Sequence, residues 1–430
     1  MQKLQDDGLL REHEIALLQD RPFEEVVADD IDEAAQKTLE LMKRGVETIY
    51  KAVLVQGHYV ANPDVLERVE GNSAFGGWYY VAVDIKRSRH LKDEYRFEGA
   101  FYAELLKRIQ RVKPQQGYVI HANGIVDSYL ISEFETEFQL TLDRIEAILD
   151  GEREAHFLTS GCKQSPWFAE CHNESKTCDD LSLLNRVWRS EVHALEDANI
   201  RSVSDLANAS VDQLKRVADV SMDRLYFLQQ QSIALVEHRE ILMGQPEFPE
   251  EPGVALVVDI ESDPLRNVDY LFGVLVIDGE SETHHSFLAD APEKEQQAWE
   301  EFVGFLDGFE GANLYHYGWY EQDVFRRMTE EYGAPPAVVQ MFNERMIDVL
   351  TRMREKVIFP TPFYSLKDIA KYLGFRWRIS DASGLDSILW YHEWLETGDQ
   401  RVLQDIVDYN EDDVRATWLV RCWALNARYV

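Results

Sequence analysis

Apolar and polar residues alternate along two separate regions of the chain. In the first region, from about Thr48 to Val126, the segments YKAVLVQGHYV, WYYVAVDIK and GYVIHANG alternate as strands do, and an amphipathic helix from Tyr95 to Val112 precedes the last of them. Strands and helices in this order predict a mixed α/β domain.

The second region lies after residue 253 and shows the same pattern more strongly. GVALVVDIES, YLFGVLVID and THHSFLA predict three sequential strands in a hairpin-like meander. A helix around Glu295 to Leu306, a strand in ANLYHYG and further helices follow. We therefore expect a second mixed α/β domain.

The segment between these regions, from Leu181 to Glu237, has apolar residues at helical spacing and predicts a small helical module of two hairpins. Ser204 and Ser210 stand where N-caps are expected. Neither hairpin turn contains a glycine, which would let backbone amides approach a phosphate, so a spacer and a DNA clamp both stay open. The proline-rich segment Met243 to Gly253 predicts the main interdomain linker.

The length of 430 residues indicates two or three domains, and 45% hydrophobic residues are enough to fill their cores. No apolar run approaches the roughly 18 residues that span a bilayer, and the charged N-terminus does not resemble a signal peptide. We expect a cytoplasmic protein without a membrane partner. The net charge of −34 opposes general nucleic-acid binding, although it does not decide the charge of a local site.

Two carboxylates mark the end of the first strand of the second region. Asp259 and Glu261 are separated by one residue, so a strand directs both side chains to one face. Such a pair is stable when a divalent cation neutralises it, and oxygen ligands favour Mg²⁺ or Mn²⁺. A solvated strand end with unrelated acids is the alternative.

The region from about Val254 to the C-terminus resembles the DEDD exonuclease branch of the ribonuclease H-like fold, particularly the YprB-like ribonuclease H-like domain. Its first motif is matched by Asp259 and Glu261, its second by HYGWYE from His316 to Glu321, and its Y-x-x-x-D motif by Tyr409 and Asp413. Glu321 replaces the usual aspartate, which makes Asp323 a rival ligand, and His316 replaces the usual asparagine.

This resemblance implies two-metal hydrolysis of phosphodiester bonds. One ion helps to make hydroxide from water, and the other stabilises the leaving oxygen. Asp259 would bridge the ions, Glu261, Glu321 and Asp413 would complete the ligand set, and the Tyr409 hydroxyl would orient the attacking water.

A second acidic pattern lies in the first region. Asp84 and Lys86 share one face of the strand WYYVAVDIK, and Asp64 precedes them by about twenty residues. Carboxylates that hold a metal beside a lysine suit phosphodiester hydrolysis, although a structural strand end with a solvated lysine gives the same pattern.

From His13 through Asp180 the chain resembles the RecB-like family of PD-(D/E)XK nucleases, with His13 as the upstream metal ligand and Asp64, Asp84 and Lys86 as the core motif. The family's Q-x-x-x-Y helix is represented by Glu98 and Tyr102, so glutamate replaces glutamine.

Three of the four cysteines, Cys162, Cys171 and Cys178, lie close together in the sequence and suggest a soft metal site. In many RecB-like nucleases four cysteines hold an iron–sulfur cluster, so the resemblance implies a 4Fe-4S cluster, whose fourth cysteine ligand is not found. Ser165 stands where a family cysteine often falls. Reduced thiols and zinc with His172 are the alternatives.

The fold class is α/β, in three parts. We expect a restriction-endonuclease-like α/β domain with the cysteine segment over 1–180, a helix-hairpin-helix-like all-helical module over 181–242, a linker over 243–253, and a ribonuclease H-like mixed-sheet domain over 254–430. This order resembles that of RecB-like nucleases, some of which continue into a helicase region, so a helicase is one expected partner.

The expected function is that of a metal-dependent nuclease that hydrolyses DNA, with RNA as the other substrate, by 3′ to 5′ exonuclease action on single strands in the C-terminal domain. The alternative is a non-catalytic nucleic-acid-binding or scaffold protein with decayed nuclease sites. DNA repair, processing of foreign DNA and RNA turnover all stay open as pathways.

Overall fold

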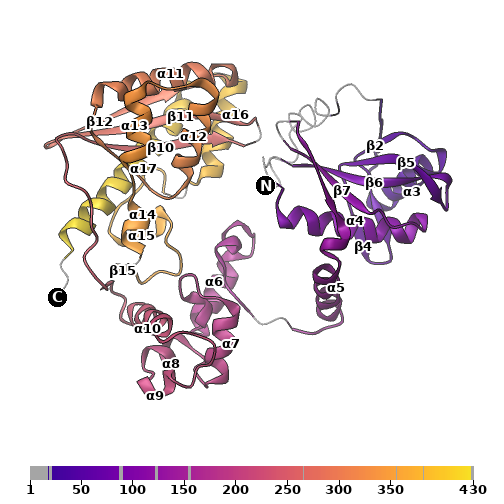
Figure 1. The fold of residues 1–430 in the computed structure, drawn as a ribbon, viewed down its shortest axis with the longest axis horizontal. Helices are drawn as coiled ribbons and strands as arrows, with labels where there is room; N and C mark the ends of the chain where they lie inside the picture. Colours follow the sequence, from indigo (N-terminus) through magenta and orange to yellow (C-terminus); the bar gives the residue numbers. More distant parts are fainter. Residues whose placement is uncertain are drawn as a thin grey trace. The chain divides into compact units, whose positions relative to one another are not determined.

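A computed structural model describes residues 18, 22–86, 91–121, 124–153, 156–264, 266–354, 356–380 and 382–427 (Figure 1). The chain forms two compact units, Met1–Glu154 with Pro264–Asn267 and Ala155–Asp263 with Val268–Val430. No helix in the described part of the chain combines the length and apolar character that a bilayer crossing needs.

The first unit is built on a six-stranded sheet in the order β1-β2-β5-β6-β7-β8. Its strands are β1 (Glu24–Glu25), β2 (Thr48–Tyr50), β5 (Val65–Ser73), β6 (Gly76–Lys86), β7 (Gln116–His121) and β8 (Val126–Leu130). Its helices are α3 (Ile31–Arg44), α4 (Asp93–Gln110) and α5 (Glu135–Leu149), and a small hairpin joins β3 (Leu54–Gln56) to β4 (Tyr59–Ala61).

The long hairpin β5–β6 and the helix α4 fix this topology. β5 and β6 pair antiparallel, whereas α4 carries the chain across so that β7 pairs parallel with β6. Ala100, Ala103 and Leu106 of α4 pack into the core with Leu66 and Tyr80 of the sheet. The helix predicted from Tyr95 to Val112 is confirmed with its bounds two residues earlier.

The helical module begins the second unit. Its helices are α6 (Phe168–Thr177), α7 (Arg189–Asp197), α8 (Val203–Ala207), α9 (Val211–Leu214) and α10 (Met222–Glu237). Ser210 caps α9 as predicted, but the prediction for Ser204 is wrong. Ser202 caps α8, because its hydroxyl accepts a hydrogen bond from Asp205 N at 3.0 Å, and Ser204 lies inside the helix.

The cysteine segment packs on this module. Cys162, Phe168 and Cys171 contact the module's apolar core, which includes Leu181 and Leu228. The compact unit therefore begins at Ala155, whereas the sequence placed the boundary at residue 180. The difference arises because the apolar side chains of this segment are buried by helices that follow it in the sequence.

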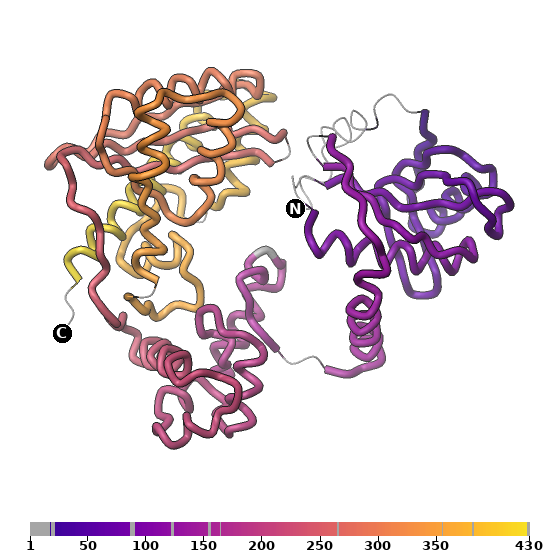
Figure 2. The backbone as a smooth tube through the Cα atoms, in the orientation of Figure 1, coloured from indigo at the N-terminus to yellow at the C-terminus, as the bar shows by residue number. Residues whose placement is uncertain are grey.

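The segment from Met243 to Gly253 contains no helix or strand and extends from the helical module to the next strand (Figure 2). Just before it, β9 (Ile241–Leu242) pairs antiparallel with β15 (Val357–Ile358). The helical module and the C-terminal domain thus share a small sheet within one compact unit.

The C-terminal domain has a five-stranded sheet in the order β12-β11-β10-β13-β14. Its strands are β10 (Ala255–Asp263), β11 (Val268–Asp278), β12 (Ser281–Leu288), β13 (Asn313–His316) and β14 (Met346–Asp348). β10, β11 and β12 pair antiparallel in sequence, which confirms the predicted meander, and β13 and β14 extend the sheet in parallel.

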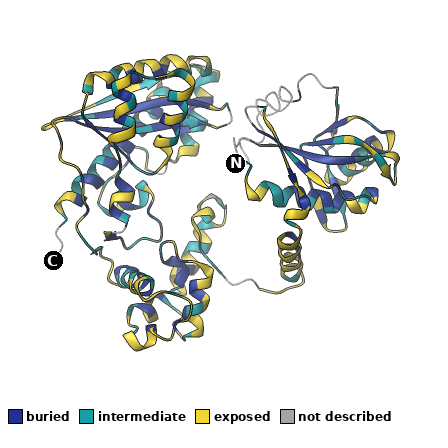
Figure 3. Cartoon of the chain, in the orientation of Figure 1, coloured by how far each residue is buried: buried dark blue, intermediate teal, exposed yellow. Residues whose placement is uncertain are grey.

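Helices cover both faces of this sheet, and its strands are largely buried (Figure 3). They are α11 (Glu295–Leu306), α12 (Tyr320–Tyr332), α13 (Pro336–Glu344), α14 (Val349–Arg354), α15 (Leu366–Tyr372), α16 (Gly384–Thr397) and α17 (Gln400–Asn426). Leu256 and Val258 of β10 pack with α11 and α12, whereas Ala255 and Val257 pack on the side of α17. The same alternation places Asp259 and Glu261 on the α17 side.

The packing of α17 on β11 requires a glycine at position 273. Gly273 pairs with Asp259 in the sheet, and a Cβ atom added to it would overlap the Asn410 side chain of α17. A glycine here therefore brings α17 close to the strand that carries the carboxylates.

We predict that Gly273→Ala lowers the free energy of unfolding by about 1–3 kcal/mol, because the added methyl group overpacks this contact. Gly304→Ala is the matched control, since Gly304 lies in α11 with open space around it and alanine there gains about 0.5–1 kcal/mol. Urea unfolding curves measure both. Equal stability of Gly273→Ala and the native protein would contradict the close packing.

Candidate metal centre

Asp259 and Glu261 lie near the end of β10, in the middle of the C-terminal sheet. Asp259 pairs with Gly273 and Glu261 with Leu271, and the register shifts directly after Glu261. The Glu261 side chain is buried, and the Ser387 hydroxyl hydrogen-bonds its carboxylate. Both acids thus lie at the point where the regular pairing is interrupted.

The long helix α17 carries the third carboxylate, Asp413, one turn after Tyr409. Trp377 Nε1 donates a hydrogen bond to Asp413 Oδ1 at 2.6 Å, and the Tyr409 hydroxyl also hydrogen-bonds this carboxylate. In the same helix, Asn410 Nδ2 donates to Asp259 Oδ2 at 2.9 Å. These contacts join α17 directly to the carboxylate of β10.

The three acids meet although about 150 residues separate the first from the last. One carboxylate oxygen from each of Asp259, Glu261 and Asp413 lies within 4.8 Å of the others, and among the described residues this is the one group of three or more acidic, histidine or cysteine side chains that meets this geometry. Glu261 and Asp413 are buried and Asp259 is half-buried, and carboxylates this close together suit a hard divalent cation such as Mg²⁺ or Mn²⁺.

Glu321 lies at the start of α12 and adds negative charge next to Asp259. Its side chain is buried, and its Oε2 atom has no hydrogen-bond partner among the described residues, although His316 Nδ1 lies 3.5 Å away. A buried oxygen without a partner fits a ligand position. Asp323, the rival from the sequence, has a side chain that is 45% exposed and forms an ion pair with Arg326.

Burial and mutual repulsion raise the pKa values of the clustered acids. Burial, with the nearby charge of Asp413, raises the pKa of Glu261 to about 8, and burial raises that of Asp413 to about 6 despite the Trp377 hydrogen bond. The pKa of Asp259 is also raised well above its usual value by burial and by the three neighbouring carboxylates. A cation bound here would relieve this repulsion.

Lys367 of α15 is a functional candidate that the sequence analysis did not identify. Its Nζ atom lies 4.5 Å from the centre of the Tyr409 ring and donates a hydrogen bond to the Ala382 carbonyl. Burial lowers its pKa, while its charge lowers the pKa values of Glu261 and Asp413. Nothing in its sequence context, YSLKDIAKYL, separates it from an ordinary helix-surface lysine.

The N-terminal unit brings most of the second predicted set together. Lys86 Nζ lies 3.0 Å from Asp84 Oδ2 and 2.6 Å from Glu98 Oε2, and the Tyr102 hydroxyl donates to Glu98 Oε1 at 2.9 Å. Asp64 precedes β5 and accepts a hydrogen bond from Ile85 N at 2.8 Å. His13, the predicted upstream metal ligand, lies outside the described residues.

The cluster around Lys86 also includes an acid with a raised pKa and a buried histidine. Burial raises the pKa of Asp84 to about 7, even though Lys86 acts in the opposite direction. His121 of β7, which the sequence analysis did not single out, pairs with Lys86 in the parallel sheet and is fully buried. His121 reaches this position because β7, which follows α4 in sequence, pairs parallel with β6.

The three clustered cysteines are free thiols. Cys162 and Cys171 lie partly buried against the core of the helical module, whereas Cys178 is exposed at the end of α6. Among the described residues no group of cysteine side chains has metal-site geometry, so the cluster implied by the resemblance has no support in the structure.

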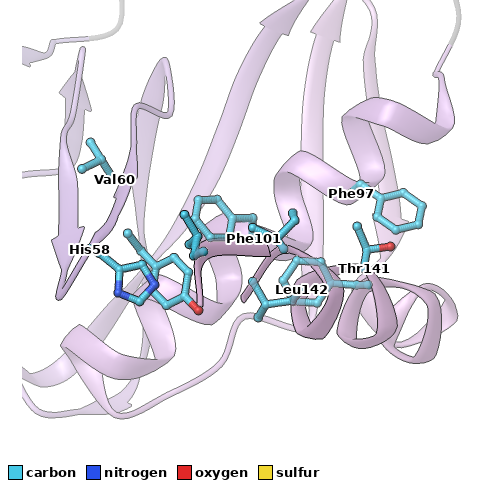
Figure 4. A pocket seen from close by; sticks show the side chains of 10 residues that line it. His58, Val60, Phe97, Phe101, Thr141 and Leu142 are labelled. Atoms are coloured by element: carbon cyan, nitrogen blue, oxygen red, sulfur yellow. The ribbon is translucent and has the colours of Figure 1, made fainter. Parts of the chain in front are cut away.

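An apolar pocket of about 380 Å³ lies in the N-terminal unit between the β3–β4 hairpin and the helices α4 and α5 (Figure 4). Phe97, Phe101 and Leu142 line it, with His58 and Thr141 as polar neighbours. No carboxylate lines the pocket, so it offers no site for the chemistry of the acidic clusters.

Comparison with known proteins supports one part of the chain. Residues 256–425 match the family model of the RNase H superfamily, which shows that the C-terminal domain is ribonuclease H-like. The match contains all four candidate carboxylates, and it supports a nuclease-type hydrolase in general. No curated protein and no solved structure matches the chain.

We predict that Mg²⁺ raises the melting temperature more at pH 8 than at pH 5. Because the pKa values of Glu261 and Asp413 are raised, the folded metal-free protein binds more protons than the unfolded chain, and it loses stability as the pH rises from about 4 through 8. Metal binding to the ionised acids restores that stability. Calorimetry with and without Mg²⁺ measures the effect, and Asp413→Asn should reduce it. An equal increase at both pH values would contradict the assignment.

Proposed function

We propose that the C-terminal domain is a metal-dependent nuclease that hydrolyses single-stranded DNA from its 3′ end. The observation that carries this proposal is the convergence of Asp259, Glu261 and Asp413 within 4.8 Å, with Glu321 beside them. The family match supports the nuclease class. The choice of DNA, the 3′ polarity and the exonuclease mode rest on the resemblance of three sequence motifs to the DEDD family.

Divalent cations held by these carboxylates would supply charge neutralisation at the scissile phosphate and activation of the attacking water. The surrounding residues set the positions of the carboxylates. Asn410 fixes one oxygen of Asp259, and Trp377 fixes one oxygen of Asp413, which leaves the other oxygens for ligation. The Tyr409 hydroxyl lies next to Asp413, where it can orient a water molecule.

The positive charge of Lys367 completes the site. Its ammonium group lies over the Tyr409 ring and is attracted by Glu261 and Asp413. A phosphodiester that enters beside these acids brings further negative charge, which a cation at this place offsets. Lys367 thus has the position of a group that stabilises the substrate phosphate or the leaving oxygen.

We predict that Asp413→Asn lowers kcat for a 3′-terminal single-stranded oligonucleotide by at least about 1000-fold, because loss of one ligand removes metal-ion catalysis. Glu321→Gln should have a large effect in the same direction. Asp323→Asn is the matched control and should leave kcat unchanged, since this acid forms an ion pair with Arg326. Release of mononucleotides in Mg²⁺ measures all three. Activity that survives Asp413→Asn but not Asp323→Asn would contradict the ligand set.

The alternative function is nucleic-acid binding without cleavage. One feature that favours this alternative is Glu321, which stands in place of the family's aspartate. A second is the pair of turn residues Arg186 and Asp219, which adopt positive φ angles of 56° and 59°. Glycine at these positions would bring backbone amides nearer to a phosphate. Binding of DNA without hydrolysis in either Mg²⁺ or Mn²⁺ would establish this alternative.

A second nuclease site at Asp64, Asp84 and Lys86 is favoured by one specific observation. Lys86 lies between two carboxylates on a β5–β6–α4–β7 framework, and burial raises the pKa of Asp84. The resemblance to RecB-like nucleases assigns a metal to the acids and phosphate stabilisation to the lysine. A helicase partner follows from the resemblance alone.

We predict that Asp413→Asn retains a slow Mg²⁺-dependent hydrolysis that the double variant Asp413→Asn/Lys86→Ala loses, because Lys86 serves the second site. Lys92→Ala, a nearby lysine outside the Asp84 cluster, is the control and should change nothing when combined with Asp413→Asn. Gel analysis of a labelled duplex and single strand measures the residual cutting. Equal residual rates with and without Lys86 would remove the N-terminal cluster from catalysis.

A further inference from the structure

A large cavity lies between the helical module and the C-terminal domain, within the second compact unit. It has a volume of about 1050 Å³, and its walls come from α6, the end of α10, the segment 360–363 and α15. The two walls are joined beside it, because Asn185 Nδ2 donates to the Pro362 carbonyl at 2.9 Å and Lys163 forms an ion pair with Asp368. The labels α6, α10 and α15 in Figure 1 locate these elements.

The charge of this cavity is opposite to that of the chain. Lys163, Lys176, Lys367 and Lys371 line it, which are four of the fifteen lysines in a protein of net charge −34. Its two acids are already engaged, since Asp368 pairs with Lys163 and Asp179 accepts a hydrogen bond from Ser204 N at 2.8 Å. Lys176 and Lys371 are exposed. The cavity therefore offers positive charge to an anion.

Aromatic rings alternate with these charges. Phe168 stacks on His172 with ring centres 5.3 Å apart, and Phe363 lies 6.1 Å from Phe168 and 4.6 Å from Lys163 Nζ. The Nε2 atom of His172 is buried without a hydrogen-bond partner among the described residues. Cations that track a phosphate backbone beside aromatic surfaces for the bases are the features by which proteins bind single strands.

Lys367 connects the cavity with the carboxylate site. It lines the cavity, and its ammonium group lies over the Tyr409 ring beside Asp413. A strand that lies along Lys176, Lys371 and Lys367 would therefore bring its end to the acids. The helical module supplies one wall of this path, which gives the module a role other than that of a spacer.

We propose that this cavity binds the sugar–phosphate backbone of a single nucleic-acid strand whose end lies at Asp259, Glu261 and Asp413. The inference rests on the proposed nuclease function of that site. It assigns strand binding to the cavity walls, although the usual hairpin glycines are missing from the module's turns.

The test compares Lys176→Ala/Lys371→Ala with Lys215→Ala/Lys294→Ala, a control of equal charge change whose lysines lie outside the cavity in surface ion pairs. Two substrates are used with Mg²⁺. One is a 20-nucleotide DNA strand, and the other is the p-nitrophenyl ester of thymidine 5′-monophosphate, which reaches only the carboxylate site. The ratio of kcat/KM for the strand to kcat/KM for the ester is measured for each protein.

We expect the cavity variant to lower this ratio about tenfold. The plot of log K for strand binding against log salt concentration should also become less steep, by about 0.7 in slope for each lysine removed. The control should change neither quantity. Equal ratios in both variants, while the native protein hydrolyses the ester, would overturn the cavity proposal and leave the proposed function intact. No hydrolysis of either substrate by the native protein would overturn the proposed function, and strand binding measured by fluorescence anisotropy would then test the cavity alone. If inorganic phosphate displaced the labelled strand as effectively as an unlabelled strand does, the cavity would bind a single anion and the proposal would be overturned.

Discussion

The mutual repulsion of buried carboxylates at the end of one central strand is the constraint on which the C-terminal domain depends. Asp259 and Glu261 lie on β10, and Asp413 reaches them from α17 because Gly273 lets that helix approach the sheet. Burial raises the pKa values of all three acids, and the charge of neighbouring carboxylates raises those of Asp259 and Glu261 further. A bound cation would relieve this repulsion, and in the proposed function it would also supply the chemistry at the phosphodiester.

Hydrogen bonds from several segments of the chain hold the acids in position. Trp377, Asn410 and Ser387 each donate to one carboxylate, and each comes from a different part of the chain. Arg378 holds the loop of Trp377 to α17, since its backbone N and side chain both bind Asp412. Hydrogen-bond donors from distant segments thus hold the three carboxylates in position.

Strand periodicity allowed much of the C-terminal fold to be predicted, because alternation sets which side of β10 carries Asp259 and Glu261 and the three-strand meander follows directly in sequence. The partners from α15 and the Trp377 loop could not be predicted in this way. Lys367, Trp377 and Ser387 reach the acids only through the packing of distant elements, and their local sequences look ordinary. The cap of α8 was misplaced by two residues. Ser202, with Asp205 three residues after it, matches the S-x-x-D capping pattern and is the residue whose hydroxyl meets Asp205 N.

The strong negative charge of the chain and the proposed substrate are compatible because charge is distributed unevenly. Four lysines line the cavity beside the helical module, whereas only two of the chain's 78 acidic residues, Asp179 and Asp368, do so. An acidic surface repels a nucleic-acid strand, so a lysine-lined cavity would favour strand binding at that place.

Electron paramagnetic resonance of the Mn²⁺-loaded protein tests the central claim most directly, since two ions within about 4 Å of each other couple their spins. A pair of ions held by these carboxylates gives a coupled signal in the native protein that is lost in Asp259→Asn. A spectrum of isolated Mn²⁺ only, or a coupled signal that persists in Asp259→Asn, would contradict the claim.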